Sequence, residues 1–145
     1  MKATRYLWGI ALLASLGSYL WALTLPAIHS SDGYLIGGAT LAFGWMQVVN
    51  LTSLAWLANP LYGLAIKYTW RNEHLVAAML LALAALVGVD TFRLESYHDG
   101  TRSDLVAVQS VGIAFYVWQL SFLLLLTANA IAAAFKRRAT EISQS

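Results

Sequence analysis

The stretch LVAVQSVGIAFYVWQLSFLLLLTANAIAAAF, residues 105–135, decides what kind of fold this chain can have. It contains no charged side chain and ends at the basic triplet Lys136, Arg137 and Arg138. An α-helix rises about 1.5 Å per residue, so this segment is long enough to cross a hydrocarbon layer of about 30 Å. The stretch therefore predicts a membrane-spanning helix that tilts or projects beyond the bilayer.

The composition of the whole chain also indicates a membrane protein. Of the 145 residues, 59% are hydrophobic and 11% are charged, and the mean hydropathy is +0.63. Soluble domains carry about 25% charged residues, so too few polar side chains are present here to cover a surface exposed to water. The absence of cysteine excludes a disulfide scaffold and a thiol redox enzyme. The net charge of +2 gives no indication of a nucleic-acid partner.

Three further apolar runs occupy residues 6–25, 34–58 and 73–92. Each is close to the length that a bilayer crossing requires. With the fourth run they predict an all-α, polytopic membrane protein, a four-transmembrane-helix bundle that forms a single domain over residues 1–145. Between the second and third spans, residues 61–70 are expected to lie along the membrane surface as a short amphipathic helix.

The basic residues predict how these spans are oriented. Seven of them fall on one side of the membrane if the chain crosses it four times: Lys2, Arg5, Lys67, Arg71, Lys136, Arg137 and Arg138. By the positive-inside rule, both termini are expected in the cytoplasm, in a multi-pass protein of the inner membrane. The last three are also expected to contact lipid headgroups. A cleaved signal peptide is the alternative for the N-terminus, but the first run is too long and has no clear cleavage motif.

The middle of each predicted span contains no Asp, Glu, Lys, Arg or His, which argues against proton-coupled transport. The polar residues there are uncharged, and those that form a candidate intramembrane site are Gln47, Asn50 and Gln119, with Trp45 and Trp118 as walls. Two interpretations stay open: hydrogen bonds between helices, typically worth about 0.6 kcal/mol each, or the lining of a pore or small-molecule site. We favour the hydrogen bonds, because uncharged amides commonly join helices in membranes.

A second group of polar residues gathers on the predicted outer face: His29, Asp32, Glu95, His98 and Asp99. Such side chains are acceptable ligands for a divalent metal. Their spacing matches no ligand motif, however, so a solvated polar loop is the preferred interpretation and no metal or other cofactor is predicted. Haem is not expected either, because the histidines lie at span ends or in loops.

Two short patterns in the third span predict local contacts. Asp90 and Arg93 are spaced i, i+3 and are expected to form a salt bridge at the outer end of the span. Ala84 and Gly88 form a small-xxx-small pair, which allows two helices to approach closely. The third span is therefore expected to pack tightly, either within the chain or between copies.

The chain carries no motif for catalysis: no G-x-S-x-G, no Walker loop, no H-E-x-x-H and no paired intramembrane carboxylates. In architecture it resembles small bacterial inner-membrane proteins that serve as accessory subunits or as immunity partners to membrane-active toxins, an analogy of fold alone. We expect a non-enzymatic accessory or binding subunit, with the bilayer and another membrane protein or copies of itself as partners. The alternative is a small homo-oligomeric channel or transporter with an amide-lined midplane.

Overall fold

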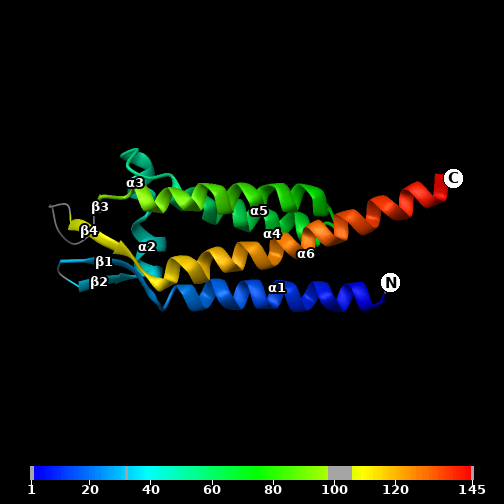
Figure 1. Cartoon of the computed structure of the whole chain (residues 1–145), viewed down its shortest axis with the longest axis horizontal. Helices are drawn as coiled ribbons and strands as arrows, with labels where there is room; N and C mark the ends of the chain where they lie inside the picture. Colours follow the sequence, from blue (N-terminus) through cyan, green and yellow to red (C-terminus); the bar gives the residue numbers. More distant parts are fainter. Residues whose placement is uncertain (1, 32, 98–105, 145) are drawn as a thin grey trace.

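The fold combines long helices with a small sheet, in a computed structural model that describes residues 2–31, 33–97 and 106–144. In chain order the elements are α1 (Lys2–Ala22), β1 (Pro26–Ser30), β2 (Gly33–Ile36), α2 (Gly37–Phe43), α3 (Trp45–Val49), the 3₁₀ turn η1 (Ala55–Leu57), α4 (Ala58–Trp70), α5 (His74–Gly88), the 3₁₀ turn η2 (Val89–Arg93), β3 (Ser96–Tyr97), β4 (Val106–Val111) and α6 (Ile113–Gln144). Helices α1, α4, α5 and α6 run along the long axis, and the strands stand at the end opposite to the start of α1 and the end of α6 (Figure 1).

The sheet is antiparallel, with strand order β2-β1-β4-β3. It begins where Pro26 follows α1, because proline lacks the N–H that a continuing helix would need. Gly33 opens β2 with a φ of 131°, a backbone conformation that glycine adopts readily and other residues avoid. The inner face of the sheet buries Ile28 and Tyr97 against Ala114 at the start of α6. The sheet is thereby held on the ends of the helices.

The prediction of an all-α, four-span bundle is wrong. The second predicted span, residues 34–58, is divided among β2, α2, α3 and η1, and the fourth, residues 105–135, has the strand β4 before its helix. The physical reason is local: Val106, Val108 and Val111 favour an extended chain because they are β-branched. Apolar runs show which segments avoid water, but both strands and helices can do so.

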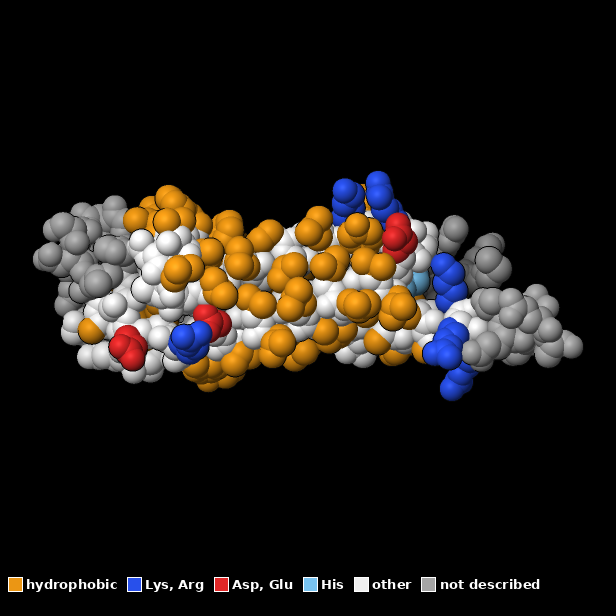
Figure 2. All heavy atoms as spheres, turned by 90° about the horizontal axis from the view of Figure 1, so that it is seen from above, with side chains coloured by type: hydrophobic (Ala, Val, Ile, Leu, Met, Phe, Trp, Pro, Cys, Tyr) orange, Lys and Arg blue, Asp and Glu red, His pale blue; other side chains and the backbone are white. Residues whose placement is uncertain are grey.

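Two described helical segments are long and apolar enough to cross a membrane, judged by length and composition: His74–Arg93 and Ile113–Ala139. A shorter apolar helix covers Gly9–Ala22. Hydrophobic side chains cover the middle of the face seen in Figure 2, and Lys and Arg side chains gather near the end opposite to the sheet. The structure thus allows membrane insertion through two helices, instead of the four crossings predicted.

Residues 61–70 are helical as expected, but they belong to the longer helix α4. One face of this helix is buried within the protein. Pro60 lies in its first turn, where the missing N–H is tolerated. Tyr62, Ala65 and Thr69 are buried, and α4 packs along α5. One face of this helix therefore packs inside the protein, while its position relative to a membrane surface stays a prediction.

Candidate functional site

A cavity of about 120 Å³ lies where the sheet meets the ends of the helices. Its walls come from α1, the sheet, α2, α3, η1, α4, η2 and α6. The aromatic residues that line it are Tyr19, Phe43, Trp56, Tyr97, Phe115 and Trp118, and the polar ones are Thr40, Gln47, Ser53, Asn59 and Thr91. Because segments distant in sequence form it, the cavity depends on the whole fold.

Two glycines allow the backbone to form the wall beside α2. A Cβ at Gly37 would overlap the carbonyl of Ala22, so only glycine lets α2 begin against the end of α1. The backbone N–H of Gly37 also donates to the Leu25 carbonyl over 2.9 Å. At Gly44 a Cβ would overlap the ring of Trp56, whose indole Nε1 donates to the Leu41 carbonyl over 2.8 Å. These contacts place the Trp56 ring in the cavity wall.

Asn59 joins three helices at the cavity. Its Oδ1 atom accepts hydrogen bonds from the Tyr19 hydroxyl over 2.8 Å and from the Trp118 indole over 3.1 Å. Its Nδ2 atom donates to the Trp56 carbonyl over 3.0 Å. The Tyr19 ring also stacks on Tyr62, with ring centroids 5.0 Å apart. One amide on α4 thus fixes the aromatic side chains contributed by α1 and α6.

Gln47 brings an amide to the cavity, and its side chain is only 7% exposed. Its Oε1 atom accepts a hydrogen bond of 2.8 Å from the Thr52 hydroxyl. Among the residues that the structure describes, no acceptor bonds its Nε2 atom. Every fully enclosed side-chain nitrogen or oxygen in that part of the chain has a partner, so this Nε2 atom is accessible. The cavity wall therefore includes a donor that no described group of the protein uses.

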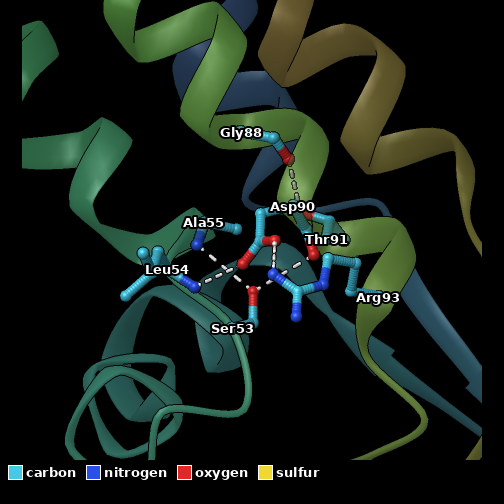
Figure 3. Close-up of polar contacts among 7 residues, drawn as sticks. All are labelled: Ser53, Leu54, Ala55, Gly88, Asp90, Thr91 and Arg93. Atoms are coloured by element: carbon cyan, nitrogen blue, oxygen red, sulfur yellow. Dashed lines mark hydrogen bonds and ion pairs between the residues drawn. The ribbon is translucent and has the colours of Figure 1, made fainter.

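Asp90 bonds to the loop after α3, beside the lining residues Ser53 and Thr91 (Figure 3). Its Oδ2 atom accepts the backbone N–H of Leu54 over 2.6 Å, and the Ser53 hydroxyl donates to the Asp90 carbonyl over 3.3 Å. The expected pair with Arg93 is confirmed, at 3.1 Å between Arg93 Nη1 and Asp90 Oδ1. The Arg93 side chain is 78% exposed, whereas that of Asp90 is 16% exposed. Asp90 is thus mainly a link between η2 and the loop.

The structure separates the five residues of the candidate intramembrane site. Gln47 and Trp118 line the cavity, whereas Trp45, Asn50 and Gln119 are not among its lining residues. Gln119 instead donates from Nε2 to the Ala85 carbonyl over 3.2 Å, between α6 and α5. Trp45 is half exposed at the start of α3, and Asn50 follows the end of that helix.

The candidate outer-face cluster is described only in part. His29 lies in β1 and Glu95 immediately precedes β3, while Asp32, His98 and Asp99 lie outside the described residues. No group of three or more His, Asp or Glu side chains within residues 2–31, 33–97 and 106–144 is placed to hold a metal ion. Lys136, Arg137 and Arg138 are exposed near the end of α6, at the end of the molecule opposite to the sheet.

Polar side chains inside the bundle bond to each other. Ser15 is fully buried, with its Oγ 2.6 Å from the Tyr62 hydroxyl and donating to the Ser121 carbonyl over 2.7 Å. Asn129 is also fully buried, and its Nδ2 donates to Thr69 Oγ1 over 3.0 Å. These bonds connect α1, α4 and α6, so the polar groups act as contacts between helices.

Asn59 and Tyr19 are not among the site residues predicted from the sequence. The signal that was present is a polar amide in the first turn of a helix, flanked by apolar residues. No known protein family, curated protein or solved structure matches this chain, so the geometry alone carries the functional argument.

Proposed function

We propose that this chain is a non-enzymatic inner-membrane protein that acts as an accessory or immunity-type binding subunit of a larger membrane assembly. The observation that carries the proposal is that the polar side chains enclosed between the helices have hydrogen-bond partners. Within the described residues, every fully enclosed polar side-chain atom has a hydrogen-bond partner. Ser15, Ser121 and Asn129 have no exposed surface at all. Such an interior suits a structural and binding role, because it holds no group ready for chemistry.

The arrangement of charge supports an orientation with both ends of the chain in the cytoplasm. The start of α1 and the end of α6 lie at one end of the molecule (Figure 1). α4 also ends near there, so the basic residues with described side chains at that end are Lys67, Arg71, Lys136, Arg137 and Arg138. Basic residues favour the cytoplasmic side of a membrane, so this end is assigned to it and the sheet to the outer side.

The channel alternative has less support, because the amide side chains that were expected to line a pore do not face a common pore. Gln119 bonds to the backbone of α5, and Gln47 lies in the cavity beside the sheet. A water-filled path needs polar groups that face a common lumen. No such lumen follows from the contacts of these two residues.

Reconstitution into liposomes separates the two functions. The purified chain alone is expected to give no more flux of ions or small solutes than empty liposomes. Gln119→Leu serves as the matched variant, since Gln119 lies outside the cavity wall. Flux through the wild type that Gln119→Leu abolishes would reject the binding role in favour of the channel.

A further inference from the structure

We infer that the cavity beside the sheet is a binding site for an uncharged, ring-sized ketone-type molecule whose carbonyl oxygen accepts a hydrogen bond from Gln47 Nε2. This inference goes beyond the role as a binding subunit and does not depend on any protein partner. It rests on the size of the cavity, on the absence of charge in its wall, and on which hydrogen-bonding groups there are already used.

The size of the cavity sets the size of the ligand. Its volume is about 120 Å³. An apolar cavity of about 150 Å³ in another protein stays dry and binds benzene, so a space of this order accepts a single ring. The aromatic wall residues, such as Trp56, Phe115 and Trp118, offer apolar contact to that ring.

The wall excludes a charged ligand. None of the lining residues that the structure describes is an Asp, Glu, Lys, Arg or His. Moving an ion from water into such surroundings without an opposite charge is strongly unfavourable. An uncharged molecule that already partitions into the membrane meets no such barrier.

Most of the side-chain donors in the wall are used. The Tyr19 hydroxyl and the Trp118 indole both donate to Asn59, and the Trp56 indole donates to the Leu41 carbonyl. The serine and threonine hydroxyls of the wall donate to backbone carbonyls. The acceptor is the carbonyl of Gly37 for Thr40, that of Asp90 for Ser53, and that of Gly88 for Thr91.

Gln47 and Tyr97 are the exceptions, because Gln47 Nε2 and the Tyr97 hydroxyl have no hydrogen-bond partner among the described residues. A hydroxyl can donate or accept, whereas Gln47 Nε2 can only donate, so Gln47 is the group that selects for an acceptor. An apolar ligand placed against this accessible Nε2 atom would separate it from water without giving it a partner, and an acceptor in the ligand avoids this penalty. A carbonyl oxygen is such an acceptor. The wall therefore favours a ring with a carbonyl over the same ring without one.

Two small molecules of the same shape test this preference: cyclohexanone, and methylenecyclohexane, in which C=CH₂ replaces C=O. Each is titrated into the ¹⁵N-labelled full chain in detergent, and binding is followed by the NMR signals of the indole N–H groups. Trp56 and Trp118 report on the cavity, while Trp70, which is 74% exposed, reports on the micelle. One neutral hydrogen bond corresponds to about a fivefold difference in affinity.

The wild type is expected to give saturable shifts at Trp56 and Trp118, with cyclohexanone binding about fivefold more tightly than methylenecyclohexane. Gln47→Leu is expected to bind both equally, and Gln119→Leu, an amide outside the wall, to keep the preference. Gln47→Met, with an unbranched side chain, gives a second test should leucine perturb folding. Equal affinity in the wild type, shifts no larger than at Trp70, or a preference that survives in Gln47→Leu would each overturn the assignment.

Discussion

The hydroxyl of Tyr19 donates a 2.8 Å hydrogen bond to Oδ1 of Asn59, and this contact ties α1 to α4 beside the cavity. The same oxygen accepts the indole N–H of Trp118 on α6. A single amide oxygen therefore holds three helices in register at the point where they meet the sheet. Asn59 is therefore expected to contribute more to stability than either of its donors.

Replacing Asn59 with leucine is expected to lower the free energy of unfolding by about 1–3 kcal/mol, because the donors of Tyr19 and Trp118 lose their acceptor. Tyr19→Phe removes one donor and is expected to cost about 1 kcal/mol. Unfolding in detergent, followed by circular dichroism, measures both. The double variant should lose less than the sum of the single losses, since the unpaired hydroxyl is gone; additive losses would contradict the shared bond.

α5 packs closely on α6 at Gly88, so a larger side chain at this position is expected to lower the stability of the protein. A Cβ there would overlap the Gln119 side chain and lie 3.1 Å from Cζ3 of Trp118. Gly88→Val is therefore expected to lower the melting temperature by several degrees, at a cost of about 1–3 kcal/mol. Gly63→Val is the matched control, because nothing lies within 4 Å of a Cβ at Gly63. Equal losses in the two variants would refute the close contact.

Asp90 and Arg93 form an ion pair, but the two residues are expected to contribute unequally. Asp90 also accepts the backbone N–H of Leu54, so Asp90→Ala should cost about 1.5–3 kcal/mol. Arg93 is largely exposed, so Arg93→Ala should cost no more than about 1 kcal/mol. Chemical denaturation of both variants compares them. A larger loss in Arg93→Ala would mean that the ion pair, and not the bond to the loop, is the main stabilising contact of Asp90.

Leu51 predicts a substitution that stabilises the protein. Its φ is 56°, a left-handed conformation unfavourable for leucine, and its side chain is 82% exposed, so little contact is lost on removal. Leu51→Gly is expected to raise the free energy of unfolding by about 0.5–1 kcal/mol. Val49→Gly, at the exposed last residue of α3, should lower it, because glycine loses more conformational freedom in a helix than valine does. A change of the same sign in both variants would argue against strain at Leu51.

The sequence predicted contacts that depend on helical spacing. Asp90 and Arg93 pair as expected, since η2 continues the turn of α5 and keeps the two side chains on one face. Ala84 and Gly88 are buried, as a small-residue pair at a helix contact requires. Both predictions used residues three or four positions apart, for which the local geometry of a helix is sufficient.

The sequence did not predict how the apolar runs are divided into elements. Residues 34–58 are apolar along most of their length, but the close approaches of Gly37 and Gly44 to distant parts of the chain break the run into short helices. Gly37 approaches Ala22 and Gly44 approaches Trp56, and each of these pairs comes together only when the chain folds. Hydropathy along a single segment contains no information about such contacts.

The candidate site shows the same limit. Gln47 and Trp118 are a polar residue and an aromatic residue inside apolar runs, which predicts them as site residues, and both line the cavity. The same pattern predicts Gln119, yet the amide of Gln119 bonds to Ala85 on α5. Which side of α6 faces the cavity is decided by the packing of α6 against α1 and α5, so the sequence could not separate these neighbours.

The mass of the native complex tests the proposed binding role most directly. The chain is purified from its host membrane in a mild detergent, and the intact complex and its components are measured by native mass spectrometry. We expect a complex in which the 15.9 kDa chain is present in fixed ratio with a different membrane protein. A complex made only of copies of this chain, stable at the same detergent concentration, would contradict it.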